Sequence, residues 1–305
     1  MSTGQQSKPM KILLTGPSGQ IGHELVATLP ALGEVVAVDR AQMDLTNPDQ
    51  IHGVLDAVRP DLVVNAAAYT AVDRAEVETQ VAFSVNATAV RFMADALGAS
   101  GAMLVHFSTD YVFDGTKRAP YVEEDRTNPL NAYGRSKLEG EKAIRASGVP
   151  HLILRTSWVY GARGRNFLTA MLGLFEEKEE LRVVDDQIGA PTWCRWIAQA
   201  TAGVLERCFA GGALRRELTG TYHMTASGST SWYGFAVAIR EQRYGAGATR
   251  PVLTAVPARA YAVAAKRPSN SVMSNDRLRK AFGIEPPDWR DRLAECFKDM
   301  TAEPL

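Results

Sequence analysis

Tyr133 and Lys137 are the two residues whose types and spacing most directly suggest chemistry. On a helix, a separation of four residues places both side chains on one face, about one turn apart. A lysine ammonium beside a phenol would lower the pKa of the phenol and prepare it to pass on a proton. Thr109, upstream in S-T-D-Y, adds a hydroxyl that can donate to a substrate carbonyl. Together these groups suit carbonyl reduction by hydride transfer, with Tyr133 as general acid.

A glycine-rich turn, Gly16-Pro-Ser-Gly19-Gln-Ile-Gly22, follows an apolar strand pattern and opens a helical one. Glycine lets the backbone turn tightly and approach a pyrophosphate, whose charge is favoured at a helix N-terminus. The spacing is G-x-x-G-x-x-G rather than G-x-G-x-x-G, and an ordinary strand-to-helix turn is the structural alternative. In this strand-helix context, the turn predicts binding of a nicotinamide dinucleotide.

Asp39 and Arg40 stand about 20 residues beyond the glycines, where the second predicted strand ends. An acidic residue at this point can bond the adenosine ribose 2′-hydroxyl, whereas an arginine can pair with a 2′-phosphate. The two residues therefore favour different cofactors, and a solvated pair at a strand end is the structural alternative. NADH, NADPH and use of both stay open.

Strand and helix patterns alternate through the first half of the chain. Strands are predicted at 11–15, 34–39, 61–65, 102–108 and 151–155, with helices at 20–29, 48–58, 78–100 and 129–147. This order predicts an α/β fold, a Rossmann-like doubly wound parallel sheet covered on both faces. Ligands bind beyond the carboxyl ends of such strands. The glycine turn, Asp39, Asn65, Thr109 and Thr156 all fall at strand ends, which supports a shared site.

The pattern is looser in the second half. Helices are predicted at 166–178, 193–209, 231–242, 276–282 and 288–300, with short strands at 181–184 and 220–224. We expect a disordered leader at residues 1–10 and an NAD(P)-binding domain at 11–160. Residues 161–305 would form mainly a smaller C-terminal substrate lobe, part of which returns to the main domain.

Composition excludes several classes of partner. The 305 residues carry no net charge, which gives no support to a nucleic-acid or anionic-membrane partner. No apolar run approaches the roughly 18 to 20 residues of a membrane helix. Three scattered cysteines indicate a reducing, cytoplasmic location. The five histidines show no ligand spacing, so no catalytic metal is predicted.

Six segments resemble one known family, the dTDP-4-dehydrorhamnose reductases within the extended short-chain dehydrogenase/reductases. They read L-L-T-G-P-S-G-Q-I-G, N-A-A-A-Y-T-A-V-D-R-A-E, F-S-T-D-Y-V-F-D-G, N-A-Y-G-R-S-K-L-E-G-E, L-R-T-S-W-V-Y-G and D-D-Q-I-G-A-P-T. The resemblance runs from about Lys11 to about Leu293. It implies that NADPH or NADH reduces the C4 ketone of dTDP-4-dehydro-6-deoxy-L-mannose to give dTDP-L-rhamnose, a precursor of cell-surface polysaccharides.

The same resemblance implies roles for individual residues. Thr109, Tyr133 and Lys137 match the catalytic positions, and Thr109, Asp110 and Trp158 match substrate contacts. For Trp158, an aromatic packed in the core or between lobes is the structural alternative. The implied cofactor contacts, taken with the glycine turn and the strand-end pair, are Gly16, Gly19, Gln20, Ile21, Gly22, Asp39, Arg40, Asp44, Leu45, Ala67, Ala68, Tyr69, Tyr133 and Lys137.

Other interpretations stay open beside this one. A sugar-nucleotide epimerase or dehydratase could use the same scaffold with tightly held NAD. A non-catalytic regulatory subunit, resembling that of methionine adenosyltransferase, belongs to another class. Some family members dimerise with help from Mg²⁺, and Glu24 matches one acidic position involved, which leaves a homodimer and a Mg²⁺ ion at its interface open. The product could also be the C4 epimer, dTDP-6-deoxy-L-talose.

Overall fold

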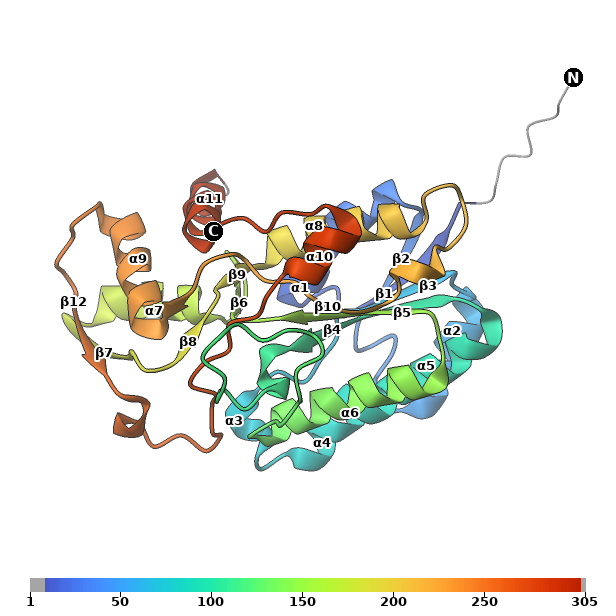
Figure 1. Cartoon of the computed structure of the whole chain (residues 1–305), viewed down its shortest axis with the longest axis horizontal. Helices are drawn as coiled ribbons and strands as arrows, with labels where there is room; N and C mark the ends of the chain where they lie inside the picture. Colours follow the sequence, from blue (N-terminus) through green and yellow to red (C-terminus); the bar gives the residue numbers. More distant parts are fainter. Residues whose placement is uncertain (1–8, 303–305) are drawn as a thin grey trace, which may run out of the picture.

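Six parallel strands form the central sheet of the protein, in a computed structural model that describes residues 9–302 (Figure 1). Their order is β10-β5-β4-β3-β1-β2, so the chain reverses its direction of travel between β1 and β3. This is the doubly wound arrangement, and it confirms the predicted α/β, Rossmann-like sheet. The strands are β1 (Lys11–Thr15), β2 (Glu34–Val38), β3 (Leu62–Asn65), β4 (Met103–Thr109), β5 (His151–Thr156) and β10 (Gly220–His223).

Alternate residues of each strand face opposite sides of the sheet, and helices cover both sides, so both faces are buried. Leu13 and Val63 pack with one set of helices, and Leu14 and Val64 pack with the other. The first set is α2 (Pro48–Val58), α5 (Ala89–Ser100) and α6 (Ala132–Ser147). The second set is α1 (Gln20–Thr28), α8 (Cys194–Cys208) and α10 (Asp276–Phe282). Figure 1 shows the two sets on opposite sides of the sheet.

The helix that carries Tyr133 and Lys137 is α6, and its start is determined by Asn131. The Asn131 Oδ1 atom accepts from the Gly134 amide at 2.8 Å, which satisfies one of the free donors of the first turn. The Nδ2 atom of the same residue donates to the Lys266 carbonyl at 2.8 Å. The helix ends at Gly148, whose φ of 69° lies in the left-handed region. One side chain therefore both caps this helix and ties it to a distant segment.

The helix predicted at 78–100 is present as an unbroken helical segment over 79–100, but it contains a π-helical turn that was not predicted. The chain forms α3 (Val72–Ala75) and α4 (Thr79–Phe83), then a π-helical turn over 84–88, and only then α5. Asn86 lies in that turn, and its amide accepts from the Tyr69 amide at 2.9 Å and donates to the Tyr69 carbonyl at 3.0 Å. It also donates to the Ser136 hydroxyl on α6. These contacts favour a wider turn at this point.

The second half of the chain divides between two cores. Strand β10 and helices α8 and α10 return to the central sheet. A separate apolar cluster includes Tyr160, Phe235 and Trp289, and it lies in the lobe at the left of Figure 1. This lobe contains α7 (Phe167–Glu177), β7 (Glu180–Val184), α9 (Trp232–Tyr244) and β12 (Val252–Val256), with α11 (Trp289–Ala302) packed against it. The β12 strand, which pairs in parallel with β7, was not predicted.

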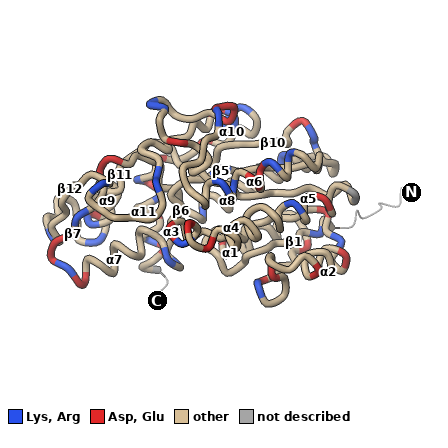
Figure 2. Tube along the Cα trace, turned by 90° about the horizontal axis from the view of Figure 1, so that it is seen from below, with Lys and Arg blue, Asp and Glu red and all other residues tan. Residues whose placement is uncertain are grey.

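Two further strand pairs connect the lobe to the sheet region. They are β6 (Val159–Tyr160) with β9 (Thr192–Trp193), and β8 (Ile188–Gly189) with β11 (Thr230–Ser231). Most of the predicted leader, residues 1–8, lies outside the described residues. Basic and acidic residues are interspersed along the chain in Figure 2, in agreement with the zero net charge. Within residues 9–302, no helix combines the length and apolarity needed to span a membrane.

Candidate active site

The glycine turn lies at the carboxyl end of β1, tight against the segment that follows β3. Gly16 has a φ of 69°, and a Cβ atom there would lie 2.8 Å from the Ala67 Cα. A Cβ on Gly22 would lie 2.0 Å from the Gly16 carbonyl oxygen. Gly19 precedes α1 with no side-chain cap on the helix, so amides of the first turn can serve an anion. This backbone cradle fits a dinucleotide pyrophosphate.

The strand-end pair follows β2. The Asp39 carboxylate accepts from the Ala41 and Gln42 amides at 2.9 and 3.1 Å, so it anchors the turn. The Arg40 side chain is 82% exposed, and its Nε lies 3.6 Å from the Asp44 carboxylate. Hydrogen bonds from Thr46 hold the pKa of Asp44 below its ordinary value. Both residues are thus at the surface beyond the end of β2, where each was predicted to meet the adenosine ribose.

The remaining predicted cofactor residues have different environments. Leu45 is buried in the core beneath α2, and Ile21 is half-buried between the two main cores. The Gln20 side-chain oxygen is buried without a hydrogen-bond partner in the described part of the chain. Ala68 is half-buried, and Tyr69 is held by Asn86 through both of its backbone groups. Asn86 was not anticipated from the sequence, which gave no signal for this pairing.

Thr109 and Tyr133 come together at the carboxyl end of β4. Thr109 ends that strand, donates to the Asp110 carboxylate at 3.0 Å and accepts from the Tyr111 amide at 3.1 Å. Burial raises the pKa of Tyr133 to about 12, and the neighbouring Thr109 hydroxyl acts in the opposite direction. The expected lowering of the Tyr133 pKa by Lys137 is wrong, because burial and the charge of Asp110 raise this pKa and Thr109 is the group that lowers it.

Lys137 is buried behind Tyr133, with only 1% of its surface exposed. Its Nζ lies 2.6 Å from the Phe107 carbonyl oxygen and 3.0 Å from the His106 Nε2, rather than beside the Tyr133 hydroxyl. Burial lowers the pKa of Lys137 to about 7, against the opposing charge of Glu141. The partner His106 was not anticipated, because the histidines were considered only as metal ligands.

The predicted substrate residues lie on either side of the strand ends. Asp110 is buried, which raises the pKa of its carboxyl to about 6, and its Oδ2 has no partner among the described residues. Trp158 has a φ of 47° and stacks on Trp232 of α9, with centroids 3.5 Å apart and planes 3° from parallel. A Cβ on Gly189 would lie 2.4 Å from the Trp158 ring. Trp158 thus joins the sheet to the lobe.

A buried ion-pair network clamps α6 onto the sheet. Glu141 is completely buried and accepts from Arg155 of β5 at 2.9 and 2.7 Å, one bond to each carboxylate oxygen. The Ser108 hydroxyl of β4 donates to the same carboxylate at 2.6 Å. These bonds lower the pKa of Glu141 to about 2, although burial acts in the opposite direction. The network fixes the helix one turn beyond Lys137.

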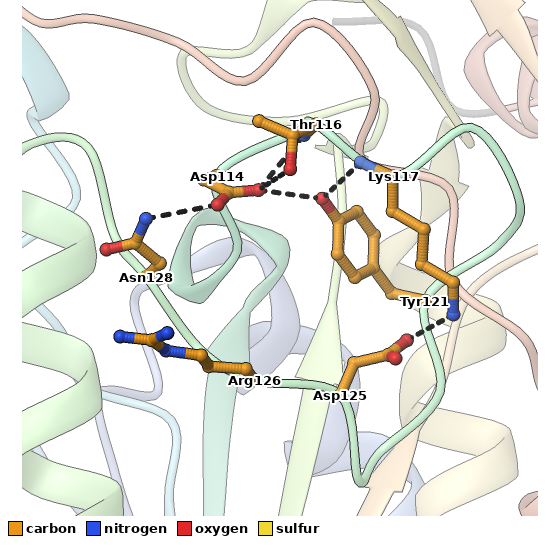
Figure 3. Close-up of a pocket in the computed structure, with 7 residues that line it drawn as sticks. All are labelled: Asp114, Thr116, Lys117, Tyr121, Asp125, Arg126 and Asn128. Carbon is orange, nitrogen blue, oxygen red and sulfur yellow. Dashed lines mark hydrogen bonds and ion pairs between the residues drawn. The ribbon is translucent and has the colours of Figure 1, made fainter.

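A hollow of about 280 Å³ lies on the loop that follows β4 (Figure 3). The Asp114 carboxylate accepts from the Thr116 amide, Asn128, the Thr116 hydroxyl and Tyr121, and these bonds hold the pKa of Asp114 well below its ordinary value. A second cavity of about 520 Å³ lies between this loop and residues 269–272. Neither hollow is lined by Tyr133 or the glycine turn. The candidate active site is therefore defined by Thr109, Tyr133 and the glycine turn rather than by these two cavities.

The acidic residue considered for Mg²⁺ is already paired. The Glu24 carboxylate accepts from Arg195 Nε at 2.8 Å, and Arg195 also pairs with Asp299. In the described residues, no group of three or more histidine, cysteine, aspartate or glutamate side chains is arranged to hold a metal ion. The Mg²⁺ interpretation therefore gains no support.

Comparison with known proteins gives a consistent result over almost the whole chain. Residues 10–302 match the family model described as RmlD substrate binding domain. The chain is 48% identical over 298 residues to the dTDP-4-dehydrorhamnose reductase of Burkholderia thailandensis, covering 96% of this chain and 100% of that protein. It is 42% identical to the enzyme of the same name from Escherichia coli K12, with 95% and 98% covered.

Solved structures agree with these relatives. A dTDP-4-dehydrorhamnose reductase from Clostridium acetobutylicum has a TM-score of 0.87 at 36% identity, covering 96% of this chain and 100% of that one. The enzyme of the same name from Bacillus anthracis, in complex with NADP, has a TM-score of 0.86 at 34% identity, covering 95% and 99%. A dTDP-glucose 4,6-dehydratase from Streptomyces venezuelae, at 18% identity and a TM-score of 0.78, covers 96% and 98% and shares the fold.

Proposed function

The chain belongs to the RmlD substrate binding domain family, and on that premise we propose that it reduces the C4 ketone of dTDP-4-dehydro-6-deoxy-L-mannose to dTDP-L-rhamnose. The reductant is NADPH or NADH. The observation that carries the proposal is the meeting of the Thr109 and Tyr133 hydroxyls at the sheet edge that also carries the glycine turn. The relatives named as dTDP-4-dehydrorhamnose reductases support the choice of substrate.

The cofactor site in this proposal is the backbone cradle at the end of β1. Gly16, Gly19 and Gly22 would hold the pyrophosphate, with Asp39 and Arg40 near the adenosine ribose. When bound, NAD(P)H supplies a hydride to the sugar C4. The NADP complex of the Bacillus anthracis relative supports the choice of a nicotinamide dinucleotide as cofactor. Further contacts would come from Gln20, Ile21, Asp44, Leu45, Ala67, Ala68 and Tyr69.

Tyr133 acts as general acid toward the sugar oxygen in the proposed mechanism. With a pKa of about 12, the phenol is protonated at neutral pH and can give its proton to the more basic alkoxide. Thr109 donates a hydrogen bond to the same oxygen as negative charge develops there. Lys137 would bond the nicotinamide ribose when the cofactor is present, from a position one helical turn beyond Tyr133. Asp110 and Trp158 hold the sugar.

The proposal includes a division of labour and a location. Residues 11–160 would bind the cofactor and the part of 161–305 that forms the lobe would bind the sugar nucleotide. Trp158, stacked on Trp232, lies where the two parts meet. All three cysteines are buried free thiols, which supports a reducing, cytoplasmic compartment. The proposed assembly is a homodimer.

The test follows absorbance at 340 nm with NADPH or NADH and substrate made in situ by an upstream dehydratase and epimerase, with the product identified by NMR. We expect one reduced cofactor to be consumed per dTDP-L-rhamnose formed. Tyr133→Phe should lower kcat by about 10² to 10⁴ while NADPH binding persists. Tyr160→Phe is the matched control, because its buried hydroxyl has no partner within the described residues. Near-normal kcat in Tyr133→Phe would refute the role of Tyr133.

The same assay separates the alternatives. An epimerase or dehydratase would turn over with no net loss of reduced cofactor, because it regenerates NAD in each cycle. A non-catalytic subunit would show no turnover and would form a stable complex with another enzyme. Formation of dTDP-6-deoxy-L-talose would keep the reduction but reverse the stereochemistry at C4.

A further inference from the structure

A row of buried polar side chains crosses three adjacent strands behind the proposed catalytic lysine. Thr15 on β1 is the register partner of Asn65 on β3, and Asn65 is the partner of His106 on β4. Register partners in a parallel sheet project to the same face. All three side chains therefore point toward the face that α6 covers, and each is at most 2% exposed.

Hydrogen bonds connect this row into one chain. The Thr15 hydroxyl lies 2.7 Å from Asn65 Oδ1, and Asn65 Nδ2 lies 3.1 Å from His106 Nδ1. His106 Nε2 then lies 3.0 Å from Lys137 Nζ. Two residues earlier on the same strands, the same face carries the apolar Leu13, Val63 and Leu104. Polar groups buried in such a core are costly unless each finds a partner, so the bonds must be satisfied together.

Counting protons along the chain gives two complementary arrangements with the same heavy-atom positions. In one, the Thr15 hydroxyl donates to Asn65 Oδ1, Asn65 Nδ2 donates to His106 Nδ1, and His106 Nε2–H donates to a neutral Lys137 amine. In the other, a Lys137 ammonium donates to His106 Nε2, and His106 Nδ1–H donates to an Asn65 amide turned by 180°, whose Nδ2 donates to Thr15. An imidazole nitrogen cannot donate to an ammonium, so a charged lysine requires the Nδ1–H tautomer, whereas a neutral amine can also accept from His106 Nε2–H.

We propose that His106 is a positioning residue for Lys137, and that its imidazole changes tautomer, without becoming charged, when the lysine gains or loses a proton. The proposal rests on the proposed function only in treating Lys137 as part of the catalytic group. It assigns to Asn65 and Thr15 the task of accommodating either tautomer. This series of hydrogen bonds ends at Thr15, which precedes Gly16 of the predicted cofactor turn. The protonation state of Lys137 is therefore linked to that turn.

The surroundings of His106 and Lys137 support both a neutral imidazole and a lysine that can gain or lose a proton. Burial and the nearby lysine charge hold the pKa of His106 well below its ordinary value, so the imidazole stays neutral. The Lys137 pKa of about 7 places its titration in an accessible range. The other titratable groups on α6 are Tyr133, Arg135, Glu139, Glu141, Lys142 and Arg145. The neighbouring turns and short helix that pack against α6 add Asp73, Arg74, Glu76, Asp110 and Tyr111. Among all of these groups, the carboxylate of Glu141 is the one whose charge raises the pKa of Lys137.

The deciding experiment is ¹⁵N NMR of the full chain with labelled histidine, recorded from about pH 5 to about pH 9, on both sides of the lysine titration. His106→Asn identifies the His106 signals by their loss. We expect the Nδ1 and Nε2 shifts of His106 to exchange protonated and unprotonated character through one transition while the ring stays neutral. In Lys137→Met the tautomer should no longer change. A single His106 tautomer throughout, or an identical transition in Lys137→Met, would overturn the proposal.

A kinetic comparison tests positioning with two matched substitutions. A glutamine amide reaches the position of imidazole Nε2, beside Lys137, whereas an asparagine amide reaches only the position of Nδ1, beside Asn65. His106→Gln should therefore retain kcat within a few fold, and His106→Asn should lose about 10- to 100-fold with NADPH affinity unchanged. His223 is another buried histidine in the same sheet, and the control variant His223→Asn should leave the dependence of kcat on pH unchanged. Equal losses in the Gln and Asn variants would contradict the positioning role.

The two readouts also separate this inference from the proposed function. The NMR transition needs neither the sugar nucleotide nor turnover. A tautomer change in a protein that fails to reduce dTDP-4-dehydro-6-deoxy-L-mannose would uphold the His106–Lys137 link and reject the assigned substrate. Turnover with a fixed tautomer would give the reverse result.

Discussion

Replacing Glu141 with glutamine removes the charge at the centre of the clamp on α6 while keeping almost the same side-chain shape. In the wild type, the carboxylate is completely buried and bonds Arg155 through both oxygens. An amide keeps one acceptor but leaves the guanidinium without its counter-charge. Removing one partner of a buried pair is strongly destabilising, typically by about 3 to 5 kcal/mol.

The contribution of Glu141 to the free energy of unfolding also follows from its pKa. It is lowered to about 2 in the folded protein, from an ordinary value of 4.5. Each pKa unit corresponds to about 1.4 kcal/mol, so ionised Glu141 stabilises the fold by about 3 kcal/mol at pH 7. Because the folded pKa is the lower one, this contribution is complete above the unfolded pKa and is lost as pH falls through the folded pKa. About 1 kcal/mol should remain at pH 3.

Urea unfolding, followed by circular dichroism between pH 7 and pH 3, measures this contribution as the difference in unfolding free energy between wild type and Glu141→Gln. The difference should shrink as pH falls. Glu139→Gln is the control, because Glu139 lies on the exposed side of the same helix and pairs with Lys142; it should change stability by less than about 0.5 kcal/mol. A Glu141→Gln difference that is small at pH 7, or that does not vary with pH, would refute the reasoning.

Three further substitutions test the cofactor and substrate assignments. Gly16→Ala should raise the Kd for NADPH at least about tenfold in a fluorescence titration, because the residue has a φ of 69° and its new Cβ would meet Ala67. Arg40→Ala should lower kcat/KM with NADPH by about tenfold and leave NADH unaffected; equal losses with both cofactors would exclude 2′-phosphate recognition. Trp232→Leu removes the ring stacked on Trp158 and should raise KM for the sugar nucleotide about 3- to 10-fold at constant NADPH affinity, as initial rates would show.

The central sheet could be predicted because its signals are local. Apolar runs bounded by glycine, asparagine and aspartate marked the strands, and β1 and α2 have the predicted bounds. The alternation of strands and helices then implied parallel pairing and a site at the carboxyl ends. The meeting of Thr109 and Tyr133 follows from that topology. The roles assigned to them stay predictions until the variants are measured.

What could not be predicted depends on contacts between distant segments. The side chain of Asn86, in the π-helical turn, is hydrogen-bonded to the backbone of Tyr69, and the hydrophobic periodicity of the sequence gives no sign of this contact. In β12, only Leu253 and Val256 are buried, so the strand lacks a regular alternation and depends on its pairing with β7. The bond between His106 and Lys137 requires α6 to pack on β4, and the bonds from His106 to Asn65 and Thr15 require the register of three strands. The pKa of Tyr133 likewise depends on burial rather than on the spacing of the lysine.

The return of β10, α8 and α10 to the central sheet has a consequence for how the chain is made. Translation produces β1 to β5 well before these three elements, and about 125 residues separate the end of β5 from the end of α10. At roughly 5 to 20 residues per second, the ribosome needs about 6 to 25 s to supply them. Until β10 is made, the β5 edge is unpaired, and until α10 is made, the sheet face of Leu152 and Leu154 lacks one of its covering helices. The central sheet therefore completes its fold only after most of the lobe has been synthesised.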